Sequence, residues 1–568
     1  MPWPVTFFPS GRTVHVVAHT TLLQAAREAG ELLETPCGGH GTCGKCRVRL
    51  RAGQAPATGS AACLSCAELD AGWRLACATP VTGPLEVEIP DVAPDACMHA
   101  ILTSGASVSM PHDPRPPGAF GVAFDLGTTT VAGTLFDLHT GRELATRAAM
   151  NRQIARGDDV ISRIDAVRRD AQALNDLQRL VVDTLNAILL DLCQTCQVSV
   201  SAIREMAVAG NTTMQHLLLG RDPSPLGEAP FTPAFTGAQT VSAAELGLRL
   251  HPDATLTVFP QIGGFVGGDT VSGLLASRLD TLPYSALLVD VGTNGEIVLQ
   301  HEGRLYAAST AAGPAFEGAR IRQGMRAAEG AIDAVWREAD DLACHVIGDG
   351  PARGLCGSAL VDAVAELLRL GAIDESGALR VPDGAAEGLA SRFQTVGGEA
   401  TVTLAWGAAG ESAVRLTQQD IRELQLASGA IRAGIETLLH TAGVTARSLG
   451  ALLLAGGFGN TLRIANAMRI GLLPRIDESA VRFIGNASLA GAKQALLAQA
   501  ERARAQSLRD RTEHIELAQQ SGFSNCLWST CSSRLNKESR HDISSRPCGL
   551  LRRCSDAHGL RRHAGRAF

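Results

Sequence analysis

Short apolar stretches near the start of the chain predict a small mixed sheet. VTFFPSGRTVHVV (residues 5–17) has alternating positions on both sides of a Pro-Ser-Gly-Arg turn, which is typical of a β-hairpin. TLLQAAREAG (residues 21–30) has apolar residues at helical spacing and ends on a glycine, which predicts a helix. CRVRL and LEVEI predict further strands. We therefore expect residues 1–94 to form one domain of strands curled over one helix.

Two apolar hairpins of one design follow much further along the chain. GVAFDLGTTTVAGTLFDL (residues 121–138) and ALLVDVGTNGEIVLQ (residues 286–300) each contain an apolar strand, a carboxylate, a turn with glycine and a second strand. The carboxylates, Asp125 and Asp290, are 165 residues apart. A design repeated in this way predicts duplicated halves that face each other across a cleft.

The turns of these hairpins have the chemistry of a phosphate site. Their glycines allow the backbone to approach a ligand closely, and their threonine and asparagine side chains offer hydrogen-bond donors. The residues concerned are Gly127, Thr128, Thr129, Thr130, Gly292, Thr293 and Asn294. Asp125 and Asp290 stand where a carboxylate can hold Mg²⁺ through water. The alternative is two structural turns closed by Asx-type hydrogen bonds, which the pairing of the copies disfavours.

Two glycine-rich stretches add candidate nucleotide contacts. ALLLAGGFGN (residues 451–460) is an apolar strand that leads into glycines, and GLCGSALVDAVAELL (residues 354–368) precedes a helix whose N-terminus can face a nucleotide. The candidate contacts in them are Gly354, Gly357, Ser358, Gly456, Gly457 and Gly459. With the hairpins, these stretches resemble the ASKHA superfamily of acetate and sugar kinases, heat-shock ATPases and actin. This resemblance implies two ribonuclease-H-like lobes that clamp ATP, with Asp125 or Asp290 positioning the metal ion and the attacking water.

Changes in composition set the expected domain boundaries. A stretch with four prolines, SGASVSMPHDPRPPGA, predicts a linker over residues 95–118 that does not need to pack. The first lobe is expected at residues 119–222 and the second at 223–522. Residues 523–568 are rich in Arg, Ser and Cys without a sustained period, which predicts a disordered or aberrant tail. The expected fold class is a multidomain α/β protein.

The composition also excludes several classes of protein. The net charge of −6 argues against a nucleic-acid binder, which would carry a basic stripe. No apolar run is long enough to predict a membrane span. The N-terminus lacks the charged start and apolar stretch of a signal peptide. A cytoplasmic protein is therefore expected, and in that reducing compartment the 15 cysteines do not predict a disulfide framework.

The sequence TPCGGHGTCGKCRVRL and one distant cysteine predict a metal centre. Cys37, Cys43 and Cys46 have C-x5-C-x2-C spacing, and Cys77 lies further along. Four thiolates suit a tetrahedral zinc ion or a [2Fe–2S] cluster. The grouping of three plus one favours the cluster, because structural zinc usually uses two close pairs.

A second ligand set stays open at this stage. Cys63 and Cys66, taken with Cys43 and Cys46, have the spacing of a zinc ribbon. Cys77 is favoured as the fourth ligand because a strand follows it, as in the β-grasp [2Fe–2S] ferredoxins that the N-terminal domain resembles.

A [2Fe–2S] domain joined to an ASKHA domain resembles the reductive activators of corrinoid proteins, over the chain to about residue 520. NRQIARGDDVISRI, VAGNTTMQHLLLG, GGFVGGD and GPAFEGARIRQGM also carry this resemblance. It implies that the cluster supplies one electron and that ATP drives its transfer to a cobalt(II) corrinoid. The corrinoid then returns to cobalt(I), so that a methyltransferase resumes its work. The resemblance also implies a homodimer.

The corrinoid is expected on a partner protein, because the sequence lacks the D-x-H-x-x-G cobalamin pattern. A low-potential donor would supply the electron. The alternative function is an ASKHA small-molecule kinase with a redox-sensing or structural iron–sulfur domain. A plain electron-transfer ferredoxin is disfavoured, because all three nucleotide loops are intact.

Overall fold

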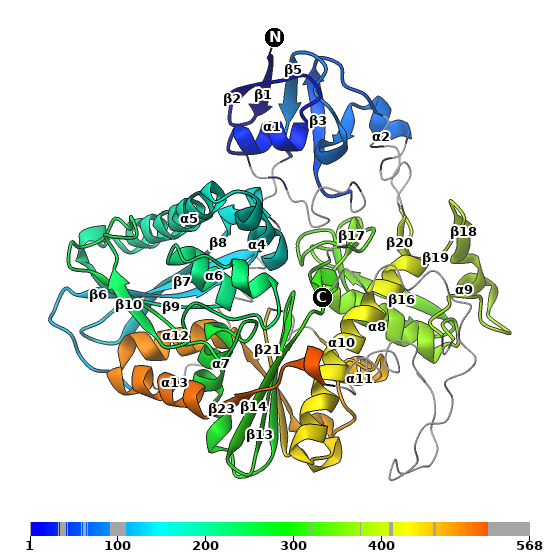
Figure 1. Cartoon of the computed structure of the whole chain (residues 1–568). Coiled ribbons are helices and arrows are strands. Elements are labelled where there is room, and N and C mark those ends of the chain that lie inside the picture. Colours follow the sequence, from blue (N-terminus) through cyan, green and yellow to red (C-terminus); the bar gives the residue numbers. More distant parts are fainter. Residues whose placement is uncertain are drawn as a thin grey trace.

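The computed structural model describes residues 2–31, 33, 41, 44–57, 60, 64, 66–90, 110–157, 159–318, 320–374, 376–407, 413–457 and 462–520. A small N-terminal domain stands apart from two larger lobes, each built on a six-stranded sheet (Figure 1). Among the described residues, no helix combines the length and the apolar character that a membrane span requires.

The N-terminal domain is a five-stranded sheet with one main helix, as the sequence predicts. Its elements are β1 (Trp3–Phe8), β2 (Arg12–Val16), α1 (Leu22–Glu28), β3 (Arg47–Ala52), α2 (Cys66–Asp70), β4 (Trp73–Leu75) and β5 (Leu85–Glu88). The strand order is β2-β1-β5-β3-β4. The helix starts at Thr21, whose hydroxyl accepts a hydrogen bond from the Gln24 N–H. Its apolar face is buried against Val5 and Phe7 of the sheet.

The first lobe has a sheet in which three antiparallel strands are followed by two parallel ones and an antiparallel edge strand. Its strands are β6 (Phe120–Leu126), β7 (Thr130–Asp137), β8 (Arg142–Met150), β9 (Ile203–Gly210), β10 (Gln239–Ser242) and β11 (Thr255–Val258). In the order β10-β11-β9-β6-β7-β8, β6 is antiparallel to β7 and parallel to β9. Because β10 and β11 belong to this sheet, the lobe boundary expected at residue 222 falls inside the sheet-forming segment.

The second lobe repeats this arrangement. Its strands are β12 (Ala286–Val291), β13 (Gly295–His301), β14 (Arg304–Thr310), β21 (Ala451–Ala455), β22 (Val481–Gly485) and β23 (Thr512–His514). The order is β22-β21-β12-β13-β14-β23, with β12 antiparallel to β13 and parallel to β21. The runs β8-β7-β6-β9-β11 and β14-β13-β12-β21-β22 match strand for strand. The two lobes are therefore duplicated ribonuclease-H-like halves, as the paired hairpins predict.

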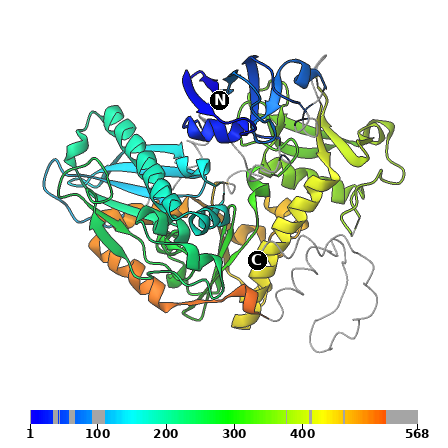
Figure 2. The same ribbon diagram turned by 45° about the horizontal axis from the view of Figure 1, so that its top comes forward.

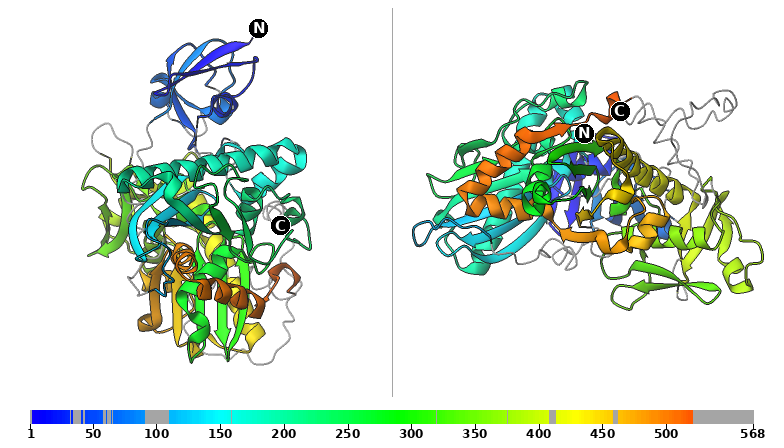
Figure 3. Two further views of the ribbon diagram at one scale, coloured as in Figure 1. Left: turned by 90° about the vertical axis from the view of Figure 1, so that its left-hand side faces the viewer. Right: turned by 90° about the horizontal axis from the view of Figure 1, so that it is seen from below.

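Helices pack on the sheets and between the lobes. Their bounds are α4 (Val160–Arg169), α5 (Gln172–Cys196), α6 (Thr212–Leu218), α7 (Gly268–Ser277), α8 (Gly357–Arg369), α10 (Gln418–Ala442), α11 (Ile464–Arg469), α12 (Ala487–Leu497) and α13 (Gln499–Arg511). One buried apolar cluster joins α7 and α12 to both sheets, through Ala123 of β6 and Leu288 of β12. Figures 2 and 3 show the N-terminal domain outside this double-lobed body. The two phosphate loops thus belong to lobes that share a core.

An extension of the second lobe is inserted between β14 and α10. It contains β15 (Ala331–Glu338), β16 (Asp341–Val346), β17 (Gly354–Leu355), α9 (Glu387–Ser391), β18 (Phe393–Val396), β19 (Glu399–Ala405) and β20 (Val414–Thr417). These strands form two three-stranded sheets, β16-β15-β17 and β18-β19-β20. Strand β17 leads directly into α8, so the extension is joined to one of the candidate nucleotide stretches.

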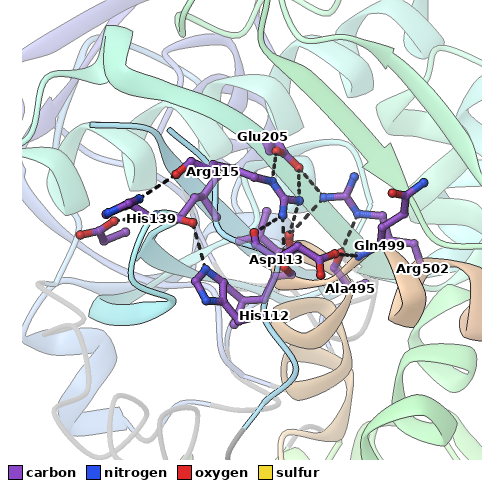
Figure 4. Close-up of polar contacts among 12 residues, drawn as sticks. His112, Asp113, Arg115, His139, Glu205, Ala495, Gln499 and Arg502 are labelled. Carbon is purple, nitrogen blue, oxygen red and sulfur yellow. Dashed lines mark hydrogen bonds and ion pairs between the residues drawn. The ribbon is translucent and has the colours of Figure 1, made fainter. Parts of the chain in front are cut away.

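The described end of the linker, residues 110–118, is fastened to the first lobe (Figure 4). Arg115 donates to both carboxylate oxygens of Glu205 in β9, at 2.7 and 3.1 Å. Arg502 of α13 pairs with the same carboxylate. Asp113 accepts a hydrogen bond from the Gln499 N–H at 2.7 Å. The Pro-rich pattern predicts an unpacked connection, whereas these residues pack, because their charged side chains find partners on β9 and α13.

Candidate nucleotide and iron–sulfur sites

Two of the four predicted cluster ligands lie side by side in the N-terminal domain. Cys46 comes directly before β3, Cys77 follows β4, and their sulfurs are 3.2 Å apart. The Cys77 N–H also donates to the Cys46 sulfur, at 3.5 Å. Two thiolates on one tetrahedral ion, with bonds of about 2.3 Å, would lie about 3.8 Å apart. The two sulfurs lie slightly closer together than this, so a small outward shift would let them hold one metal ion of a cluster.

The other candidate thiols are not among the side chains that the structure describes. Cys37 and Cys43 lie outside the described residues, as do Cys63 and the side chain of Cys66. The zinc-ribbon alternative gives no role to Cys77, although its sulfur lies next to a ligand that both hypotheses share. The geometry therefore favours the [2Fe–2S] ligand set.

The first phosphate loop is held by side chains from other segments. Its residues are Gly127, Thr128, Thr129 and Thr130, and all four are partly exposed. The Thr128 hydroxyl accepts from Asn211 Nδ2 at 2.9 Å, and the Gly127 carbonyl accepts from Asn151 Nδ2 at 3.0 Å. A Cβ at Gly127 would lie 2.4 Å from the Thr130 carbonyl oxygen, so the turn requires glycine there. The loop backbone is thus fixed in advance of any ligand.

Arg163 of α4 supports the same loop from a fully buried position. Its guanidinium donates to the Thr128 carbonyl at 2.7 Å, to the Gly157 carbonyl at 2.9 Å and to the Gln153 side chain at 3.0 Å. The sequence analysis missed Arg163, because nothing local distinguishes it from the exposed arginines of the same helix. Its role depends on where α4 packs.

Replacing Arg163 with Met is expected to weaken both the fold and nucleotide binding. Met fills similar space but leaves the Thr128 and Gly157 carbonyls and the Gln153 side chain without this donor, and each unsatisfied buried group costs about 1–3 kcal/mol. We expect the free energy of unfolding to fall by about 3 kcal/mol or more. Urea denaturation and ATP titration measure the two effects. Arg179→Met, which removes only exposed ion pairs on α5, is the control, and equal effects of the two variants would contradict the role of Arg163.

The second phosphate loop, residues 292–294, follows Asp290 at the end of β12. The Thr293 hydroxyl donates to the Glu317 carboxylate at 2.5 Å. The Gly292 N–H donates to the Asn294 carbonyl at 3.0 Å, which closes the turn. Two loops of one design therefore stand at equivalent positions in the two lobes.

The glycines of the site differ in how much space a Cβ atom would have. A Cβ at Gly292 would meet nothing closer than 3.6 Å, so crowding does not explain that glycine. Gly456 has a φ of +95°, and a Cβ there would lie 2.7 Å from Asp290 Oδ1. A Cβ at Gly354 would lie 2.4 Å from the Gln323 carbonyl oxygen. Close approach to the Asp290 carboxylate thus occurs from the glycine loop after β21. Gly457 is described beside it, and Gly459 lies outside the described residues.

Four carboxylates gather where the two loops meet: Asp125, Asp269, Asp290 and Glu296. Burial raises the pKa of Asp290 to about 7, and the charges of Asp269 and Asp125 add to the shift. Burial and the charge of Asp125 raise the pKa of Asp269 to about 6. Burial, with Asp269 and Asp290, raises the pKa of Glu296 well above its usual range. Carboxylates that repel one another in this way favour a bound cation.

Asp125 and Asp290 differ in how the protein engages them. Asn486 Nδ2 and Ser488 Oγ donate to the two oxygens of Asp125, at 2.9 and 2.7 Å. In the described part of the chain, the Asp290 carboxylate accepts no comparable hydrogen bond. Asp290 is therefore the better placed of the two to hold water or a hydrated cation. The sequence analysis gave no role to Asp269 or Glu296.

The raised pKa of Asp290 predicts that the protein loses stability as the pH rises. The carboxyl has a pKa near 3.8 when unfolded and about 7 when folded, so between these values only the folded state keeps its proton. With EDTA and no nucleotide, we expect this group to lower the melting temperature between about pH 4 and 7, and to add no further slope above about pH 8. Asp290→Asn is expected to flatten this slope, as differential scanning calorimetry measures. Identical slopes in both proteins would contradict the assignment.

Helix α8 is joined to β15 and to α11 by its own polar side chains. The helix begins at Gly357, and Ser358 donates its hydroxyl to the Asp333 carbonyl at 2.7 Å. This hydroxyl is thus used within the protein, and the backbone N–H groups of Ser358 and Ala359 donate to the Cys356 sulfur. Asp362 accepts from Asn466 Nδ2 at 2.6 Å and so ties α8 to α11, the helix after the glycine loop.

Comparison with known protein families matches most of the chain. Residues 285–541 match the C-terminal domain of RACo, the ASKHA domain, and residues 120–282 match the RACo middle region. Residues 5–82 match the 2Fe-2S iron-sulfur cluster binding domain. The first of these matches continues past residue 523, where the sequence predicts that a tail begins.

Individual relatives agree with the family matches. The corrinoid activation enzyme RamQ of Eubacterium limosum is 36% identical over 427 residues, which cover 74% of this chain and 72% of the relative. The [Co(II) methylated amine-specific corrinoid protein] reductase of Methanosarcina barkeri is 27% identical, over 66% of this chain and 70% of the relative. A solved structure of a reductive activator for corrinoid, iron-sulfur protein is 30% identical, with a TM-score of 0.68, and covers 93% of this chain and 98% of its own.

Proposed function

The chain belongs to the reductive activators of corrinoid proteins, and we propose that it uses ATP to return a partner's cobalt(II) corrinoid to cobalt(I). The corrinoid is the substrate and is carried by a methyltransferase protein. A low-potential donor supplies the electron, and the reaction takes place in the cytoplasm. The observation that carries the proposal is the presence, in one chain, of a thiolate pair fit for a metal cluster and of two facing phosphate loops.

The residues divide into two groups by role. Cys37, Cys43, Cys46 and Cys77 would hold the [2Fe–2S] cluster, which supplies one-electron chemistry when bound. Thr128 and Thr293 donate to phosphate groups of ATP, and Asp290 holds a hydrated Mg²⁺ ion between the loops. Asp125 joins this site to α12 through Asn486 and Ser488.

The energy that ATP binding offers is of the required size. Moving one electron uphill by about 200 mV costs about 4.6 kcal/mol. A ligand that shifts a conformational equilibrium from about 1:99 to 99:1 supplies about 5.5 kcal/mol. Closure of two lobes around ATP therefore accounts for the step without a covalent intermediate on the protein.

A spectroscopic assay tests this function. The protein is mixed with a low-potential reductant, Mg-ATP and a cobalt(II) corrinoid protein, and the visible spectrum is followed. Cobalt(I) is expected to form faster and further with ATP than without it. If several corrinoid proteins give no ATP-dependent cobalt(I), while a small metabolite stimulates ADP release many-fold, the protein is a small-molecule kinase instead.

A further inference from the structure

One polar contact joins the cluster-binding end of the N-terminal domain to the second lobe. Lys45, which directly precedes Cys46, donates its ammonium group to the Gly324 carbonyl. The chain contains only three lysines, at positions 45, 493 and 537, although Lys and Arg together number 51. Figures 1 and 2 both show the N-terminal domain beside the part of the second lobe that carries β17. The contact therefore lies between a metal-binding loop and the nucleotide lobe.

Gly324 belongs to a turn, residues 318–325, that is bonded to the start of α8; we name it the docking turn. The Met325 N–H donates to the Leu355 carbonyl, and the Leu355 N–H donates to the Gln323 carbonyl, both at 2.9 Å. Leu355 is the last residue of β17 and lies two positions before Gly357, where α8 begins. The docking turn is thus bonded to the strand that leads into this helix start, which is a candidate nucleotide contact.

The other end of the docking turn is bonded to the second phosphate loop. Glu317 immediately precedes the turn, and its carboxylate accepts a hydrogen bond from the Thr293 hydroxyl at 2.5 Å. The turn is also fastened to α10, where Asp420 accepts from the Arg322 N–H at 2.7 Å. A continuous set of hydrogen bonds and covalent neighbours therefore runs from Thr293 to Lys45.

A phosphate group at the second loop would disturb the first of these bonds. A threonine hydroxyl has one proton to donate, so Thr293 cannot serve Glu317 and a phosphate oxygen together. The phosphate would also repel the Glu317 carboxylate, because both are negative. Binding of a nucleoside triphosphate therefore withdraws one of the anchors that fix the docking turn.

From these contacts we propose that nucleotide binding releases the N-terminal domain from the second lobe, with Glu317 as the sensing residue and Lys45 as the positioning residue that is released. The inference rests on the proposed function in that it takes the phosphate loops to bind ATP. In the docked arrangement the Cys46 end of the domain faces its own lobe. Release makes the Cys46 end of the domain accessible to a partner protein. The ligand that drives the reaction thus also frees the electron-carrying domain.

Lysine labelling in the intact holoprotein tests the inference directly. An N-hydroxysuccinimide ester modifies accessible lysines, and with three lysines in the chain each site is resolved by mass spectrometry. Saturating Mg-ATP, or a non-hydrolysable analogue, is expected to raise the labelling rate of Lys45 several-fold. Lys493, which pairs with Glu143 on the first lobe, is the internal control and should not change.

Binding of nucleotide is measured separately by calorimetry, so that failure of this inference is distinguished from failure of the proposed function. If nucleotide binds and the Lys45 rate stays constant, the inference is wrong and the proposed function stands. If no nucleotide binds at all, both fail.

A matched pair of variants tests the role of Glu317. Glu317→Ala is expected to give fast Lys45 labelling without nucleotide and no further rise with it, because the anchor is already lost. Glu317→Gln keeps an oxygen that accepts from Thr293, so it should label slowly without nucleotide. Glu338→Ala, at the exposed end of β15, is the surface control. A full nucleotide response in Glu317→Ala would overturn the sensing role.

Discussion

Asp290→Asn is expected to abolish the ATP-dependent part of cobalt(I) formation. The substitution keeps the shape of the side chain but removes the negative charge that we propose holds a hydrated cation at the phosphate loops. Loss of one such group typically costs about 10²–10³ in rate, so ATP turnover should fall by at least about 100-fold. The N-terminal domain should remain reducible by dithionite, because Asp290 lies in the second lobe. Cobalt(I) formation and phosphate release measure the two effects.

Asp477→Asn is the matched control for this prediction. Asp477 is an exposed cap of a short helical turn, and Asn can cap the same turn, so this variant should behave as the wild type. Undiminished ATP stimulation in Asp290→Asn would show that the Mg²⁺ ion is held by another of the four carboxylates.

Cys46→Ser and Cys77→Ser are each expected to remove the iron–sulfur cluster. Their sulfurs are 3.2 Å apart, so each variant takes one thiolate from the same metal ion. The red-brown colour should be lost, and iron and sulfide should fall from about two of each per chain to near zero. Elemental analysis and visible absorption measure this loss. Cys196→Ser, at the end of α5, is the control.

The zinc-ribbon hypothesis predicts a different pattern. It requires one zinc ion per chain that is lost in Cys63→Ser and kept in Cys77→Ser. Metal analysis of these two variants therefore separates the two ligand sets.

The architecture could be predicted from local signals, because each lobe begins with a hairpin that carries its own pattern. The strand–Asp–Gly-Thr–strand sequence occurs at Asp125 and again at Asp290, and the two sheets share five strands in the same order. The thiol pair was predictable for the same reason, since the spacing around Cys46 is diagnostic of a ligand loop.

The rest of the site depends on long-range packing, which leaves no local signal. Arg163, on α4, donates to the Thr128 carbonyl of the first phosphate loop. Asn486, just before α12, donates to the Asp125 carboxylate. Glu296 follows a loop that was identified, but its raised pKa arises from burial beside Asp269 and Asp290. A sequence pattern cannot show which of many acidic and basic residues are brought together when two lobes pack.

Residues 110–118 are bonded to β9 and α13. The N-terminal domain is therefore linked covalently to the two lobes, and its docking is an intramolecular binding event. Two modules joined in one chain reach effective concentrations on the order of 1 mM. A docking contact with a Kd of about 1 mM would then be occupied about half of the time, whatever the protein concentration. A partner protein at about 1 μM would have to bind that surface roughly 1,000-fold more tightly to compete equally. Dilution should therefore leave the docked fraction unchanged, while cutting the chain between residues 90 and 110 should abolish docking.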